Sequence, residues 1–92
     1  MIVHYRSRLA RALLPKRYVA ITISHHVLTP EASLDPRVLR HEAAHVAQYR
    51  RYGLVGFLTR YAWWHLRYGY RDNPLEIEAR HAENDIAPAI EV

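Results

Sequence analysis

Two short segments, Asp35-Pro36 and Asn73-Pro74, constrain the fold more than any other feature of the sequence. Aspartate and asparagine are good N-cap residues, and proline is favoured in the first turn of a helix, so each pair predicts a helix start. Gly53 is a natural stop for the first of these helices, which is therefore expected over residues 36–52. The second is expected over residues 74–87, ahead of the next proline.

The residues before these helices predict one more helix and then a strand. Residues 1–15 form a basic amphipathic segment, in which Leu9 and Leu13 stand at helical spacing among three arginines. Residues 17–28 alternate β-branched side chains with small or polar ones, which is typical of a strand. Val27 and Leu28 are candidates for a second strand or hairpin partner.

A further helix is expected from Leu54 to Tyr68, with an apolar stripe along one side and Gly69 at its end. The predicted order is therefore helix, strand or hairpin, and three helices. A chain of 92 residues, numbered 1–92, has room for a single domain built from these elements. We expect an α+β fold in which a short sheet or hairpin packs on the helix of residues 36–52.

The absence of cysteine limits the chemistry available to the chain. Disulfides, thiolate zinc sites and cysteine nucleophiles are excluded, so a metal site has to use histidine and carboxylate ligands. The net charge is +4, but the arginines are spread through every segment and match no nucleic-acid-binding motif. We therefore expect no specific nucleic-acid partner. The sequence shows no signal peptide and no transmembrane segment, so a cytoplasmic location is the expectation.

The first capped helix carries a chemically specific motif, His41-Glu42-Ala43-Ala44-His45. Histidines four residues apart project from one face of a helix and can hold a single zinc ion. Glu42, next to the first histidine, can activate a zinc-bound water as a general base without itself binding the metal. Because the arginines of this helix gather on another side, the histidines are expected at the edge of its buried face, beside a cleft.

A catalytic zinc site needs a third protein ligand and an open position. The next histidine after His45 is His65, which lies in an apolar stripe where a core histidine is at least as good an interpretation. The carboxylates that follow Pro74 are better placed, because their helix can return towards the motif. These carboxylates are Glu76, Glu78 and Glu83.

Two segments resemble the gluzincin family of zinc metallopeptidases, and especially its compact single-domain members, the minigluzincins. Residues 40–49, Arg-His-Glu-Ala-Ala-His-Val-Ala-Gln-Tyr, are similar to the active-site helix of these HExxH proteins. Residues 69–79, Gly-Tyr-Arg-Asp-Asn-Pro-Leu-Glu-Ile-Glu-Ala, are similar to the start of their glutamate helix, which supplies the third zinc ligand, often as Glu-x-x-Ala. The resemblance covers roughly residues 18–83 and implies a mini-zincin fold with bound Zn²⁺.

The resemblance implies that Glu76 is the third zinc ligand, with Ala79 completing the Glu-x-x-Ala pattern. Glu76 is also three residues after the Asn73 cap, where a glutamate often folds back onto the amide of the cap residue. Glu78 is then the alternative ligand. Because the two glutamates lie about 200° apart on a helix, only one of them can face the metal.

Peptide hydrolysis also needs a donor that stabilises the oxyanion. Tyr70, Tyr68 and His65 precede the glutamate helix and are candidates for this catalytic residue. Tyr70 is the first choice because it belongs to the segment that resembles the family. The chain departs from larger gluzincins at Arg80, where many have an aspartate that supports a zinc-binding histidine, so another residue has to give that support.

Three functions are compatible with the sequence. The first is zinc-dependent hydrolysis of peptide bonds in a peptide or protein substrate, with Glu42 as the base. The second is a catalytically weak or latent zinc-binding scaffold, because a chain this short has few residues to enclose a substrate. The third is a basic protein that docks on nucleic acid or a membrane surface through its arginines and Trp63.

Overall fold

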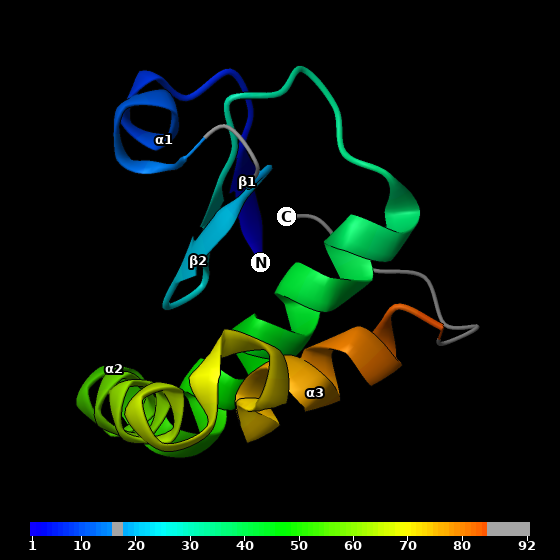
Figure 1. Ribbon diagram of the computed structural model, residues 1–92. Coiled ribbons are helices and arrows are strands. Elements are labelled where there is room, and N and C mark those ends of the chain that lie inside the picture. The colour runs from blue at the N-terminus through cyan, green and yellow to red at the C-terminus, as the bar shows by residue number, and fades with distance from the viewer. Residues whose placement is uncertain (16–17, 85–92) are drawn as a thin grey trace.

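The computed structural model describes residues 1–15 and 18–84. Its elements in chain order are β1 (Ile2–His4), α1 (Arg8–Leu13), β2 (Ile21–Ile23), β3 (His26–Leu28), α2 (Pro36–Asp72) and α3 (Pro74–Ala82). Figure 1 shows α1 and the sheet in the upper part of the molecule, with α2 and α3 side by side below them. The chain is therefore a small α+β fold with a three-stranded sheet and a long helix.

The sheet is built around β3, which lies between β1 and β2. β2 and β3 pair antiparallel as a hairpin, with Thr22 opposite Val27, and Ser24 in the turn has a left-handed φ of 56°. β1 pairs parallel with β3, with Val3 opposite Val27. β2 also contacts α2, so the sheet packs on the helix that carries both motif histidines.

Residues 1–15 do not form the single amphipathic helix that their spacing predicts. Ile2–His4 form β1 instead, because the edge of β3 offers backbone partners that the local sequence does not reveal. The amide of Ile2 donates to the carbonyl of His25 over 2.8 Å, and the amide of Thr29 donates to the carbonyl of His4 over 3.0 Å. The prediction of helix is therefore wrong for the first residues of the chain.

The helical part of the N-terminal segment, α1, is short. Ser7 caps it by accepting a hydrogen bond from the amide of Ala10 over 3.1 Å. Ala10 is fully buried, whereas Leu9 and Leu13 are more than half exposed. The packing of Ala10, and not of Leu9 or Leu13, therefore holds this helix against the rest of the chain.

Two glycines divide α2. The backbone leaves the helical region at Gly53 (φ 74°) and again at Gly69 (φ 80°), where a residue with a side chain would be strained. The expected helices over residues 36–52 and 54–68 therefore both form, and they meet at a kink without an intervening loop. Asp35 caps the first of them by accepting a hydrogen bond from the amide of Arg37 over 2.8 Å.

α3 begins where the sequence predicts. Asn73 is fully buried, and its side-chain oxygen accepts a hydrogen bond from the amide of Leu75 over 3.0 Å. The helix ends at Ala82, earlier than the predicted end at residue 87, and residues 85–87 of that prediction lie outside the described residues.

The core lies between α2 and α3. Tyr49, Phe57 and Leu75 form its buried cluster, and the rings of Tyr49 and Phe57 stack with their centroids 3.8 Å apart. Leu75 anchors the first turn of α3 in this cluster. Glu76, the next residue, is thereby placed close to the motif on α2.

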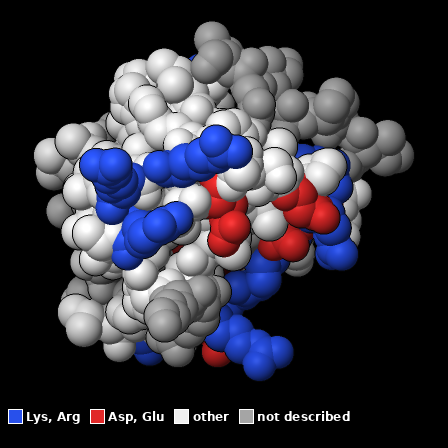
Figure 2. All heavy atoms as spheres, turned by 90° about the horizontal axis from the view of Figure 1, so that it is seen from above, with Lys and Arg blue, Asp and Glu red and all other residues white. Residues whose placement is uncertain are grey.

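The surface seen from above carries charges of both signs. Figure 2 shows lysine and arginine side chains on either side of a group of aspartate and glutamate side chains. This face is therefore not the uniformly basic surface that a nucleic-acid backbone favours. Among the described residues, no helix combines the length and apolar character needed to span a bilayer.

Candidate metal centre

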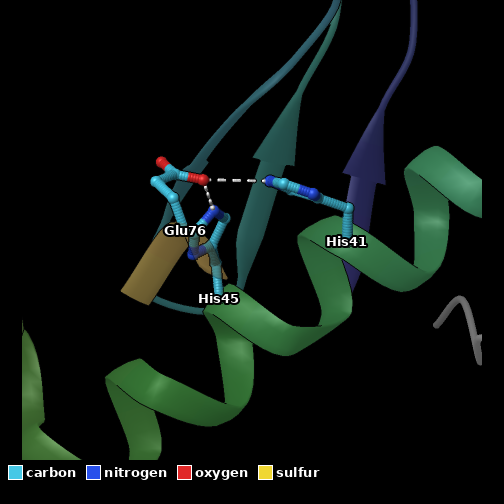
Figure 3. Close-up of side chains that lie close together, drawn as sticks. All are labelled: His41, His45 and Glu76. Carbon is cyan, nitrogen blue, oxygen red and sulfur yellow. Dashed lines mark hydrogen bonds and ion pairs between the residues drawn. The ribbon is translucent and has the colours of Figure 1, made fainter. Parts of the chain in front are cut away.

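Two helices bring three potential metal ligands together. His41 and His45 lie one turn apart on α2, and Glu76 lies in the first turn of α3. Glu76 Oε1 is 3.1 Å from Nε2 of His41 and 3.1 Å from Nε2 of His45 (Figure 3). One ligand atom from each residue lies within 4.8 Å of the other two, so the group could hold a metal ion.

The spacing of these atoms fits a tetrahedral metal. With bonds of about 2.0–2.1 Å, the ligand atoms around a tetrahedral zinc ion lie about 3.3 Å apart. The two separations of 3.1 Å measured from Glu76 are close to that value. Two imidazoles and one carboxylate also make a common catalytic ligand set, which leaves a fourth position open to a water molecule or substrate.

A second partner fixes each histidine ring. His41 Nδ1 is 2.7 Å from Glu83 Oε2, and His45 Nδ1 is 2.9 Å from Gln48 Oε1. Partners of this kind orient metal-binding histidines and leave Nε2 of each ring directed at the shared point. Glu83 and Gln48 therefore orient the two rings.

Glu76 is buried and held as a carboxylate. Tyr61 donates its hydroxyl hydrogen to Glu76 Oε2 over 2.6 Å. Burial alone would raise the pKa of Glu76, but hydrogen bonds with His41, His45 and Tyr61 hold that pKa well below its usual range. The second carboxylate oxygen is thus occupied, and Oε1 is left for the histidines.

The surroundings of both histidines favour the protonated, positively charged ring. Burial would lower the pKa of His41, but its hydrogen bonds to Glu76 and Glu83 outweigh burial and raise the pKa to about 8. Burial opposes the charge on His45 as well, and the hydrogen bond to Glu76 again raises its pKa. The carboxylate of Glu76 therefore favours the protonated form of both rings, and a metal ion bound here would displace those protons.

Glu42 lies beside the three ligands but is not one of them. It lines the same cavity as His41 and His45, and only 7% of its surface is exposed. Thr22 on β2 donates its hydroxyl hydrogen to Glu42 Oε2 over 2.5 Å, and Tyr49 donates to the carbonyl of Thr22 over 3.1 Å. Within residues 1–15 and 18–84, Oε1 of Glu42 has no hydrogen-bond partner, so this oxygen is available to a molecule in the cavity.

A cavity of about 360 Å³ opens over the cluster. Its walls come from the segment after α1, from β2, from both main parts of α2 and from α3. The apolar and aromatic side chains that line it are Leu14, Pro15, Tyr18, Ala20, Ile21, Tyr49, Phe57, Leu58, Tyr61 and Tyr70. An apolar cavity with a few convergent polar groups is typical of a substrate site.

The alternative ligand Glu78 lies away from the two histidines. Its Oε1 accepts a hydrogen bond from Nε2 of Gln48 over 2.9 Å, and its Oε2 is 3.5 Å from Arg51. Glu76, in contrast, contacts both histidines. It does not fold back onto the backbone amide of Asn73, because that amide donates to the carbonyl of Tyr70. Of the two glutamates, the structure therefore brings Glu76 to the motif.

Tyr70 lines the cavity outside the ligand cluster. Its ring meets the ring of Tyr18 edge to face, with centroids 5.9 Å apart. Burial raises the pKa of Tyr70 to about 12, and the charge of Glu76 adds to this, so the hydroxyl stays protonated and can donate a hydrogen bond. His65 also lines the cavity and is exposed, whereas Tyr68 is not among the lining residues.

The sequence indicates the ligands better than the residues that orient them. Gln48 stands three residues after His45, so their contact follows from helical spacing and could have been predicted. Thr22 donates to Glu42, and Tyr61 donates to Glu76, from other parts of the chain. No local sequence signal predicts either contact.

The residues define a class of site: two histidines and a glutamate at a metal-binding spacing, with a second carboxylate beside them in an apolar cavity. Comparison with known protein families, curated proteins and solved structures finds no match for this chain. What the site can do therefore follows from the chemistry of its own residues.

Proposed function

We propose that this chain is a zinc-dependent peptidase of the gluzincin type, with a compact mini-zincin fold. The observation that carries the proposal is the meeting of Glu76 with His41 and His45 beside the carboxylate of Glu42. The sequence resemblance implies Glu76 as the third ligand, and the chemistry of the His-Glu-x-x-His motif implies Glu42 as the base. Zinc suits the site because imidazole and carboxylate are among its ordinary ligands and the chain has no thiolate.

Zinc held by the three ligands would polarise a water molecule and the carbonyl of a bound peptide. Glu42 is the general base in this proposal. Its Oε1 accepts a proton from the attacking water and then passes a proton to the nitrogen of the departing amine, so one water is consumed for each C–N bond broken. Thr22 keeps Oε2 engaged and thereby fixes the orientation of the carboxylate.

Tyr70 is proposed as the donor to the oxyanion, because its protonated hydroxyl belongs to the same cavity as Glu42. The apolar walls of the cavity suit a peptide that presents an aliphatic or aromatic side chain next to the scissile bond. The substrate class is therefore a peptide or protein.

Glu42→Gln tests the proposal. The amide keeps the shape of the side chain but cannot accept the proton, so hydrolysis of a fluorogenic peptide mixture should fall by about 10²- to 10⁴-fold. The zinc content should stay unchanged, because Glu42 is not a ligand. Glu31→Gln is the matched control, since Glu31 is exposed and does not line this cavity.

Two outcomes would contradict the peptidase. One is a Glu42→Gln protein with wild-type turnover. The other is a wild-type protein that binds zinc tightly and hydrolyses no peptide, which would favour a zinc-binding scaffold.

A further inference from the structure

The part of α2 between its two glycines presents an exposed apolar face. Phe57, Tyr61 and Trp64 attach this segment to the core on one side. Five other apolar side chains are exposed: the exposed fractions are 49% for Leu54, 72% for Val55, 50% for Leu58, 61% for Trp63 and 84% for Leu66. Of these five, Leu58 also lines the cavity. In helical projection these five side chains occupy about half of the circumference. They are called the 54–66 face below.

The same stretch of chain carries only positive charge. No acidic residue occurs between Glu42 and Asp72, whereas five arginines do: Arg50, Arg51, Arg60, Arg67 and Arg71. Arg51 pairs with Glu78. In the part of the chain that the structure describes, none of the other four has a carboxylate within ion-pair distance. Their charge is therefore available to an anionic partner.

We propose that the 54–66 face docks on the surface of an anionic lipid membrane. Leucine, valine and tryptophan at one face of a helix enter the boundary between lipid headgroups and acyl chains, and arginines at its border pair with lipid phosphates. Arg60 and Arg67 border the face next to Trp63 in helical projection. Their long stems allow each guanidinium to reach the phosphates while the apolar side chains are buried.

The chemistry of the face favours lipid over two other partners. A second copy of the chain would bring the same arginines against each other in a two-fold interface, because each copy offers the same surface. A nucleic acid would neutralise the arginines but would leave the aliphatic side chains of Leu54, Val55, Leu58 and Leu66 against phosphate or water. An anionic membrane satisfies both the apolar and the charged groups.

Vesicle flotation with the full chain tests the proposal. The chain should bind vesicles of phosphatidylcholine mixed with phosphatidylglycerol more tightly than vesicles of phosphatidylcholine alone, and added salt should weaken the binding. Val55→Ser together with Leu66→Ser should lower the affinity for the mixed vesicles by at least about tenfold. Both residues are strongly exposed, and neither lines the cavity, so circular dichroism and metal binding should be unchanged.

The matched control replaces exposed leucines elsewhere. Leu9→Ser with Leu13→Ser on α1 should leave vesicle binding within about twofold, because these residues are also more than half exposed but lie outside the face. A second arm removes charge: Arg60→Gln with Arg67→Gln should lower the affinity for the mixed vesicles about tenfold or more.

Four results would overturn the proposal. One is the absence of binding to the mixed vesicles. A second is binding that survives both the serine pair and the glutamine pair. Another is a dimer, detected by sedimentation, that the serine pair dissociates while vesicles do not bind, which would assign the face to a second copy. The last is equally tight binding to an oligonucleotide that the serine pair does not affect, which would reduce the interaction to general attraction by the arginines.

Discussion

Thr22→Val isolates the hydrogen bond that orients Glu42. Valine has nearly the shape of threonine but no hydroxyl group, so Oε2 of Glu42 loses a donor 2.5 Å away. Water cannot readily replace that donor, because the exposed fractions of the two residues are only 8% and 7%. A hydrogen bond to a charged group contributes about 1.5–3 kcal/mol to stability.

This free energy sets the size of the expected effect. In a domain of this length each kcal/mol shifts the melting temperature by roughly 4–8 °C, so Thr22→Val should lower it by at least roughly 6 °C. Peptide hydrolysis should also fall, because the proposed base is no longer oriented. Zinc affinity, measured by competition with a chromogenic chelator, should change little, because Glu42 is not a ligand.

Two variants separate the hydroxyl group from other effects of the substitution. Thr22→Ser keeps the hydroxyl and should recover most of the stability and turnover. Thr59→Val makes the same chemical change at an exposed helix position, where the hydroxyl donates only to backbone carbonyls, and should have little effect. Wild-type melting and turnover in Thr22→Val, or an equal loss in Thr22→Ser, would refute the assigned role of the hydroxyl.

Three further measurements address the metal centre. Protein purified without chelator should contain about one zinc ion per chain, and a chelator should lower its melting temperature; no zinc and no response to added zinc would exclude the site. Glu76→Ala should weaken zinc affinity at least about tenfold, whereas Glu78→Ala should cost mainly surface charge, and the reverse order would make Glu78 the ligand. Glu83→Gln should weaken zinc affinity by about 10- to 100-fold, because His41 loses its charged partner; an unchanged affinity would show that this contact does not orient the ring.

The helix starts could be predicted because the signals for them are local. Asp35 and Asn73 each cap a helix by accepting a hydrogen bond from the amide two residues further on, and the structure confirms both starts. β1 could not be predicted in this way. Its partners are the backbone groups of β3, more than twenty residues further on, and helical spacing around Leu9 and Leu13 contains no information about them.

In the candidate site too, contacts within one helix could be predicted and contacts between helices could not. The pair of His41 and His45 follows from spacing on one helix, but spacing alone does not decide between Glu76, the expected ligand, and Glu78, the alternative. The burial of Leu75 and Ala79 decides between them, because it sets which side of α3 faces α2. Glu76 is thereby turned to the histidines and Glu78 to Arg51, and this rotation depends on packing between two helices.

The position of Glu76 relative to His45 has a consequence for the lifetime of the protein. A metal held by both would act as a cross-link that closes a loop of 31 residues, in a chain that has no cysteine to form one. By the loop-entropy relation used for disulfides, such a closure contributes about 3–4 kcal/mol. That is a large part of the roughly 5–15 kcal/mol by which domains are usually stable. Loss of the metal would then leave a larger fraction of the chain unfolded and open to proteases.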